Sequence, residues 1–213
     1  MYIPQHFAET RTEVMHGLLR QYPLGTLVTL EDGSLNANHM PFELDAEVAP
    51  LGVLRAHMPR ANPAWRSAAA GSEVLVIFHG PQAYVTPSWY ATKQESGRVV
   101  PTWNFMVVHA YGPLQVVDDP LRLRAHLERL TAQMESGREH PWRVADAPED
   151  YIGKLAQALV GIEIPIARLQ GKWKLSQNQP AENREGVERS LRSAGTDNAR
   201  AVADALAARR FDY

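Results

Sequence analysis

Residues 24–42 read LGTLVTLEDGSLNANHMPF and decide the fold class of this chain. Apolar residues alternate weakly from Leu24 to Leu30, and the pair Asp32-Gly33 is a strong signal for a tight turn between antiparallel strands. A return strand is predicted over about residues 35–42. The stretch therefore predicts a β-hairpin, which is the simplest unit of an antiparallel sheet.

Further segments of strand character follow the hairpin along the chain. They are predicted over residues 53–57, 74–79, 83–90, 102–117 and 160–169. Gly80-Pro81 is expected to form the turn between two of them, and Gly112-Pro113 is expected to bend the longest one. Because most of these strands follow one another in hairpin-like order, the pattern favours an antiparallel barrel over a doubly wound parallel sheet.

Helices are predicted to interrupt and flank the strands. They are expected over residues 11–21, within 60–70, over 120–135, 148–159, 182–192 and 198–209. The sequence therefore predicts a β-rich α+β fold that ends in a pair of helices separated at Gly195. We expect one domain over residues 1–213, with the barrel and its helices in 1–170 and a helical extension in 171–213.

The composition excludes several classes of protein. Of the 213 residues, 45% are hydrophobic, which is enough for a core and excludes a mainly disordered chain. The 22 Lys and Arg residues face 24 Asp and Glu residues, so no global positive field draws the chain to nucleic acid or anionic lipid. The absence of cysteine excludes disulfides, thiolate metal sites and a cysteine nucleophile.

Targeting signals and common catalytic motifs are also missing from the sequence. The start, MYIPQHF, lacks the basic and apolar regions of a signal peptide, and no apolar run approaches the roughly 20 residues that cross a bilayer. We therefore expect a cytoplasmic protein with no membrane partner. No two glycines lie closer than Gly17 and Gly25, which excludes GxGxxG and P-loop motifs, and HExxH, GxSxG and SxxK are absent as well.

Segments at the ends of the predicted strands combine aromatic with polar side chains. They are NHMPF (38–42), AHMPRANPAW (56–65), YVTPSWY (84–90), VPTWNF (100–105) and GKWKLSQN (171–178). A flat aromatic ligand that carries a phosphate requires this mixture, because rings cover its faces, amides and hydroxyls meet its edges, and Arg or Lys binds the phosphate. FMN fits this pattern. The alternative for any one segment is core or rim packing.

These segments resemble the PaiB family of FMN-binding negative transcriptional regulators. The resemblance covers almost the whole chain and rests on Met1-Tyr2-Ile3-Pro4 with Phe7, NHMPF, HMPRANP with Trp65, SWY, VPTWNF and KLSQN. It implies a split β-barrel related to the pyridoxamine-phosphate oxidase type of flavoprotein. It also implies a homodimer with FMN at the subunit interface and a role in transcriptional repression.

The candidate cofactor-binding residues come from these motifs. They are His57, Arg60, Asn62, Ser88, Trp89, Thr102, Trp103, Asn104, Lys174, Ser176 and Gln177. Arg60 is a candidate for the phosphate because a guanidinium offers a bidentate fork, and His57 and Asn62 could donate to phosphate or ribityl oxygens.

Strand periodicity orders the other candidates. Thr102 and Asn104 share one face of a regular strand and Trp103 lies on the other, and Ser88 and Trp89 are expected where a strand end faces the flavin ring. Lys174, Ser176 and Gln177 are expected on one face, with Lys174 near the phosphate or the flavin N1–O2 edge.

Three alternatives remain open on the sequence alone. The chain could be an FMN-dependent oxidoreductase acting on a small molecule, although no acid–base pair marks a catalytic set. A haem-binding split barrel is suggested by histidines on predicted strands, which are His39, His57, His79 and His109. The last two helices have roughly helix-turn-helix dimensions, but 8 basic against 6 acidic residues in 171–213 favour an ordinary packed pair over direct DNA binding.

Overall fold

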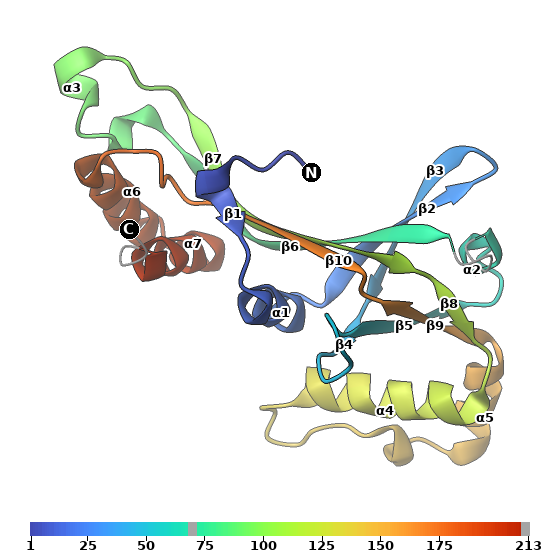
Figure 1. Cartoon of the computed structure of the whole chain (residues 1–213). Coiled ribbons are helices and arrows are strands. Elements are labelled where there is room, and N and C mark those ends of the chain that lie inside the picture. Colours follow the sequence, from blue (N-terminus) through green and yellow to red (C-terminus); the bar gives the residue numbers. More distant parts are fainter. Residues whose placement is uncertain (68–71, 210–213) are drawn as a thin grey trace. The chain divides into compact units, whose positions relative to one another are not determined.

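The computed structural model describes residues 1–67 and 72–209, which form two compact units (Figure 1). Unit 1 contains Met1–Arg11, His79–Val108 and the chain from Gln170 onward, whereas unit 2 contains Thr12–Phe78 and His109–Leu169. Each unit therefore combines segments that are distant in the sequence. The single-domain prediction stays a prediction.

The predicted hairpin is confirmed in unit 2. Strand β2 (Leu24–Glu31) pairs with β3 (Ser34–Pro41) in antiparallel register, with Leu30 opposite Leu35. Between them, Asp32 has φ 49° and Gly33 has φ 80°. Positive φ at both central residues is the mark of a type I′ turn, whose twist matches that of the flanking strands. The Asp-Gly pair therefore sets the register of this hairpin.

The prediction of a turn at Gly80-Pro81 is wrong. The chain instead forms one long strand, β6 (Glu73–Val85), which continues through both residues. Proline fixes φ near −65°, which an extended backbone accepts where the ladder does not need its missing N–H. In unit 2 the first part of β6 pairs with β2, with Phe78 opposite Gly25.

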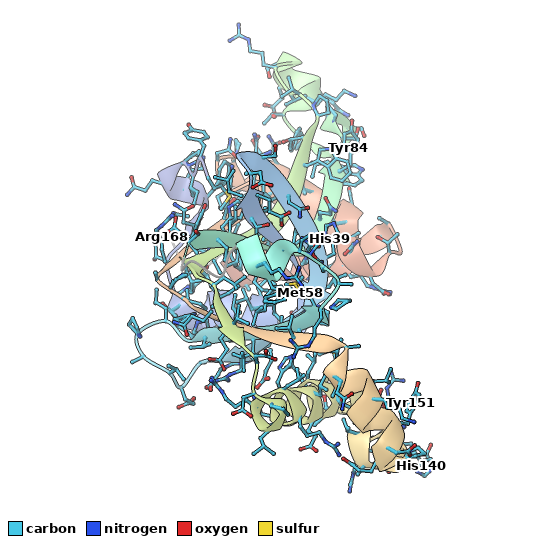
Figure 2. All side chains as sticks on the ribbon, turned by 90° about the vertical axis from the view of Figure 1, so that its right-hand side faces the viewer. His39, Met58, Tyr84, His140, Tyr151 and Arg168 are labelled. Carbon is cyan, nitrogen blue, oxygen red and sulfur yellow. The ribbon has the colours of Figure 1, made fainter. Side chains whose placement is uncertain are left out.

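A second antiparallel sheet in unit 2 has the strand order β4-β5-β9-β8. Its strands are β4 (Glu43–Asp45), β5 (Val53–Pro59), β9 (Leu159–Pro165) and β8 (Gln115–Val117). Alternate residues of β5 are buried, among them Met58, which is labelled in Figure 2. Buried aliphatic residues of β9 such as Ile162 and Ile164 extend this core. Unit 2 thus has the half-buried alternation of an antiparallel sheet.

Helices flank this second sheet, as predicted. α4 (Pro120–Glu135) lies along it (Figure 1), and α5 (Glu149–Gln157) follows later in the chain. Asp119 caps α4 by accepting a hydrogen bond from the amide of Leu121 at 2.8 Å, and Pro120 occupies the first position, where no N–H is required. α1 (Thr12–Gln21) packs against β4. The short helix α2 (Ala64–Ser67) is part of the predicted 60–70 segment, of which 68–70 lie outside the described residues.

Unit 1 has the strand order β1-β10-β7-β6. The short strand β1 (Ala8–Glu9) pairs with β10 (Arg168–Lys174), and β7 (Thr102–Pro113) follows. The sequence predicted a single strand over 160–169, whereas β9 ends at Pro165 and β10 starts at Arg168. The reversal at Ile166-Ala167 carries none of the Gly, Asn or Asp residues that signal turns, which is why the sequence did not indicate it.

The predicted C-terminal pair of helices is confirmed in unit 1. α6 (Ala181–Ser193) and α7 (Asp197–Ala208) lie side by side (Figure 1), and Val187 and Leu191 of α6 and Val202 and Leu206 of α7 are buried. Gly195 separates them with φ 74°, a conformation that favours glycine. The other short helical segments of unit 1 are η1 (Gln5–Phe7), η2 (Pro87–Trp89) and α3 (Lys93–Ser96); unit 2 has η3 (Val144–Asp146).

The predicted fold class, a β-rich α+β fold with antiparallel strands and flanking helices, is therefore confirmed. Within the described ranges, no helix combines the length and apolar character that a membrane span requires.

One buried carboxylate ties the start of unit 1 to its last helix. Glu9 is almost fully buried and accepts hydrogen bonds from Arg11 Nε at 2.9 Å and from Arg209 at the end of α7. Burial alone would raise the pKa of Glu9, but the hydrogen bonds from Arg11 and Arg209 outweigh it and lower the pKa to about 2. Arg209 is itself 12% exposed. Both charges therefore depend on each other for solvation.

We expect Glu9→Gln to destabilise the chain at pH 7 by about 3 kcal/mol, because it leaves Arg209 buried without a carboxylate. The wild-type advantage should be complete above the unfolded pKa of 4.5 and fall as the pH drops toward 2, since the folded pKa is the lower one. Urea unfolding midpoints at several pH values measure this difference. The exposed Glu13→Gln is the control, and equal midpoints for Glu9→Gln and wild type at pH 7 would contradict the expectation.

Candidate functional site

A small polar pocket lies in unit 1 where β7 begins and β10 ends. Its volume is about 170 Å³. The lining residues are Tyr90, Arg98, Val99, Val100, Thr102, Asn104, Lys174, Ser176, Asn178 and Gln179. The pocket therefore brings together Thr102, Asn104, Lys174 and Ser176 of the predicted set, which come from two motifs about 70 residues apart.

The charge of this pocket is positive. Its lining contains two cations, Arg98 and Lys174, and no carboxylate. Lys174 is half-buried, and its ammonium donates to the Thr102 hydroxyl and, at 2.9 Å, to the Trp103 carbonyl. Burial lowers the pKa of Lys174, and the neighbouring Lys172 lowers it further. The site thus holds a cation in place without supplying its counter-charge.

Buried hydrogen-bonded side chains, among them Asn104 and Ser176, form part of the pocket wall. Asn104 is fully buried, and its amide group donates to Ser176 Oγ at 3.0 Å while its carbonyl oxygen lies 3.1 Å from the same hydroxyl. Burial raises the pKa of Tyr90, and a hydrogen bond with Ser176 opposes that rise. Ser176 has φ 62°, which is unusual for a residue other than glycine. Such backbone is found where the surroundings over-determine it, often at functional sites.

Lys174 and Ser176 line the same pocket, but the expectation that Gln177 shares their face is wrong. Lys174 is the last residue of β10, and the left-handed backbone at Ser176 ends the strand periodicity. Gln177 turns back and accepts from the Leu175 amide at 2.7 Å while donating to the Trp173 carbonyl. Gln177 therefore closes the turn after β10.

Helix α6 positions the segment that forms another wall of the pocket. Asn183, almost fully buried, accepts from the Thr92 amide at 3.1 Å and donates to the Thr92 hydroxyl at 2.9 Å. Its amide group also donates to Gln179 at 3.1 Å. These bonds fix the chain before Arg98 relative to the turn after β10. The sequence reasoning missed Arg98 and Asn183 because an arginine in a polar loop and an asparagine in a helix carry no motif.

The same helix also supports Trp89. A Cβ on Gly186 would lie 2.2 Å from the Trp89 carbonyl oxygen, so only glycine allows α6 to approach η2 this closely. Ser88 is exposed and lies 3.1 Å, Oγ to Oγ1, from Thr86. The predicted strand over 83–90 therefore ends at Val85, and Ser88 and Trp89 belong to η2 because Pro87 starts a helical turn.

An aromatic groove of about 540 Å³ forms a second feature of unit 1. Tyr84 (labelled in Figure 2), Trp89 and Trp103 line it together with residues of α6 and of the start of α7. Tyr84 and Trp103 are each about half exposed and meet edge to face with ring centroids 5.9 Å apart. Trp103 alternates with Thr102 and Asn104 on β7, so this groove and the polar pocket lie on opposite faces of that strand.

The predicted group His57, Arg60 and Asn62 lies in unit 2. Arg60 forms an ion pair with Asp118 and donates to the Gln157 carbonyl at 3.0 Å. Asn62 accepts from the Ala64 amide at 3.0 Å and donates to Asn38 at 2.7 Å. These contacts commit Arg60 and Asn62 to structural partners, and their role in cofactor binding stays a prediction.

His57 ends a buried chain of polar side chains in unit 2. Its Nδ1 lies 3.1 Å from His126 Nε2, and His126 Nδ1 lies 2.8 Å from a carboxylate oxygen of Glu43. Burial lowers the pKa of His57 to about 4, and His126 adds to this effect. Burial alone would raise the pKa of Glu43, but hydrogen bonds from His126 and Arg129 lower it overall. His57 is therefore neutral and Glu43 ionised, with His126 of α4 between them, and the three side chains join α4 to the sheet.

In the described ranges, no group of three His, Cys, Asp or Glu side chains could hold a metal ion.

The glycine at position 186 gives a test of how α6 positions η2. We expect Gly186→Ala to lower the free energy of unfolding by about 1–3 kcal/mol, because the added Cβ must displace the Trp89 carbonyl. Gly153→Ala is the matched control in α5, where a Cβ meets no atom within 4 Å and helix propensity favours alanine. Urea unfolding measures both variants, and a Gly186→Ala variant as stable as wild type would refute the close packing.

The lowered pKa of His57 predicts a loss of stability in mild acid. The unfolded chain takes up a proton near pH 6.5 whereas folded His57 resists it until about pH 4, so stability should fall by up to about 3 kcal/mol over that interval. The His57→Asn variant should lack this pH-dependent loss of stability. The control variant His140→Asn, at an exposed histidine, should retain it. Unfolding midpoints from pH 7 to pH 4 measure the effect, and identical pH profiles for wild type and His57→Asn would contradict it.

Comparison with known proteins places the chain in a family. A family model described as "Putative FMN-binding domain" matches residues 1–168. The uncharacterized protein AN0679 of Emericella nidulans is 36% identical, with 96% of this chain and 95% of the relative covered. Protease synthase and sporulation protein PAI 2 of Bacillus subtilis is 30% identical, with 97% of this chain and 96% of the relative covered.

Solved structures show the same fold. The FAD and heme binding protein from Mycobacterium smegmatis superposes with a TM-score of 0.61 at 19% identity, covering 89% of this chain and 80% of that one. The flavocytochrome Anf3 from Azotobacter vinelandii gives a TM-score of 0.59 at 14% identity, covering 81% and 72%. This likeness confirms the split-barrel fold class. The chain therefore belongs to the FMN-binding family of the PaiB type that its motifs indicated, and FMN is its cofactor.

Proposed function

We propose that the chain is a PaiB-type negative regulator of transcription that works as a homodimer and responds through its bound FMN. The regulatory part is supported by the similarity to PAI 2, whose name refers to protease synthesis and sporulation. The observation that carries the flavin part is the carboxylate-free pocket with Arg98 and Lys174. FMN supplies electron or hydride transfer when it is bound, and the protein supplies binding and orientation.

The residues of unit 1 fit the chemical groups of FMN. Ammonium and guanidinium groups suit a phosphate, and the hydroxyls and amides of Thr102, Ser176 and Asn178 suit ribityl oxygens. The polar pocket, at about 170 Å³, is smaller than the roughly 300–1,000 Å³ of sites that enclose a drug-sized ligand, so it suits one end of the cofactor.

The charges of the helical pair argue that regulation does not run through direct reading of DNA by α6 and α7. Arg192 is paired with Glu188 at 3.2 Å and with Asp204 at 2.7 Å, and Arg200 is paired with Asp197. DNA binding requires cations that are free to neutralise phosphates. The ion pairs of Arg192 and Arg200 leave fewer cations for DNA, which supports packing within unit 1 as the role of the two helices.

The proposed homodimer has apolar surface to bury. Tyr84 and Trp103, which line the aromatic groove, are each about half exposed. Aromatic side chains are enriched in the buried parts of protein interfaces. A second copy of the chain over this surface would remove these side chains from water.

The proposal is tested by deleting the gene and complementing it with wild type or with a variant that has lost FMN. We expect the deletion to raise a set of transcripts, wild type to repress them again and the FMN-free variant to fail. Purified protein should release FMN and have twice the mass of the 23.8 kDa chain by light scattering.

Retardation of the affected promoters at several salt concentrations is the accompanying measurement. We expect no specific complex with a steep salt slope, whereas such a complex would mean direct DNA reading. Unchanged transcripts together with turnover of a nicotinamide donor would favour the FMN-dependent oxidoreductase instead. A strict monomer would contradict the dimer.

A further inference from the structure

We propose that the pocket around Lys174 and Arg98 is the oxyanion site that receives the phosphate of FMN. The inference rests on the proposed flavin binding and adds which end of the cofactor is held, and by which residues. Lys174 and Ser176 lie beyond residues 1–168, which are the part matched by the family model. The C-terminal turn after β10 would then be part of the cofactor site.

The balance of charge is the first argument. Other arginines such as Arg55, Arg122 and Arg129 pair with carboxylates within the fold. Arg98 and Lys174 share one pocket, and neither forms an ion pair within residues 1–67 and 72–209. The hydrogen-bond partners of the Lys174 ammonium are a neutral hydroxyl and a neutral carbonyl, which replace only part of the solvation that a half-buried cation loses. A phosphate in this pocket would supply that counter-charge.

The geometry of Lys174 is the second argument. Two acceptors, the Thr102 hydroxyl and the Trp103 carbonyl, hold its ammonium in a fixed position. An ammonium has three donors, so one remains for an oxygen of the ligand. Because the side chain is ordered before the ligand arrives, binding costs little further conformational entropy. Lys174 therefore has the position of a preorganised anion ligand.

The surrounding backbone is the third argument. Ser176 keeps its left-handed conformation because Asn104 holds its hydroxyl from a fully buried position. On the other wall, Asn183 fixes Thr92 ahead of Arg98, which is exposed and lines the pocket. A strained turn and a restrained loop thus frame the same small volume. This combination is typical of a built site rather than of a surface gap.

Arg60 is the alternative phosphate ligand that the sequence suggested. Its guanidinium is engaged by Asp118 and by the Gln157 carbonyl. A phosphate at Arg60 would have to compete with that carboxylate, whereas no carboxylate lines the pocket at Lys174. The balance of charge therefore favours Lys174 and Arg98 over Arg60 as ligands of the FMN phosphate.

The experiment compares FMN with riboflavin, which has the same ring and ribityl chain but no phosphate. The full-length protein, freed of flavin by dialysis, is titrated with each compound, and binding is followed by the change in flavin fluorescence. We expect Lys174→Met to weaken FMN binding by about 10- to 100-fold and to leave riboflavin binding within about twofold, because the loss is one charge-assisted hydrogen bond to phosphate. Arg98→Met should show the same selectivity with a smaller loss.

Lys172→Met is the matched control. Lys172 lies two residues before Lys174 on the same strand, but it donates to the Tyr2 carbonyl at 3.1 Å and does not line the pocket. The Lys172→Met variant should bind FMN and riboflavin with wild-type affinity. Inorganic phosphate should compete with FMN for the wild-type protein but not for Lys174→Met. This competition tests whether the pocket binds phosphate independently of the flavin ring.

The affinities of the variants for FMN and riboflavin decide whether Lys174 and Arg98 bind the phosphate. Unchanged FMN affinity in both Lys174→Met and Arg98→Met would overturn the phosphate site and leave flavin binding intact. An equal loss of FMN and riboflavin would show a structural role for Lys174 and would also overturn it. If wild type binds neither flavin, the proposed function and this inference both fail. Circular dichroism of each variant identifies a folding defect, in which case Arg98→Met alone decides the matter.

Discussion

A half-buried ammonium without a carboxylate is the constraint on which this account of the site depends. Lys174 is fixed by Thr102 and Trp103 in a pocket whose other charged group is Arg98. Protein interiors pair their charges because an isolated ion loses several kcal/mol of solvation. A half-buried ammonium that lacks a carboxylate partner is therefore costly, and an anionic ligand would offset that cost. In unit 1, Thr102 and Trp103 hold the Lys174 ammonium, and Asn183 restrains Thr92 in the chain before Arg98.

The two units use charge in opposite ways. In unit 2, Arg55 contacts Asp45 and Glu163, and Glu43 accepts from His126 and Arg129, so that cations and carboxylates neutralise one another within the fold. In unit 1, the Glu9 carboxylate satisfies Arg11 and Arg209, while the pocket keeps its positive charge. The contrast distinguishes charge that holds the fold from charge that is available to a ligand.

Local chemistry explains how much of the fold could be predicted from the sequence. Asp32-Gly33 and Asp119-Pro120 act through their own backbone preferences, so the hairpin and the start of α4 were predicted correctly. Gly80-Pro81 has the same local signature but lies within β6, because tertiary pairing overrides a turn preference. The reversal before β10 has no local signature at all. Prediction thus succeeded where one short segment determines its own conformation.

The candidate site follows the same logic. Motifs indicated Thr102, Asn104, Lys174 and Ser176, and the structure brings them together because β7 and β10 are neighbours in unit 1. Arg98 enters the site through the hydrogen bonds that Asn183 makes to Thr92, a contact across 91 residues that no spacing reveals. The His126–Glu43 contact spans 83 residues and was missed for the same reason. Residue types could be predicted from motifs, whereas long-range partners required the fold.

Phosphorus NMR of FMN bound to the full-length protein tests the central claim most directly. A free phosphate monoester takes up its second proton near pH 6. If Lys174 and Arg98 contact the phosphate, their charges favour the dianion, and the resonance of bound FMN should not titrate until well below pH 6. A bound phosphate that titrates as it does in free FMN would lie in solvent, and that result would contradict the account.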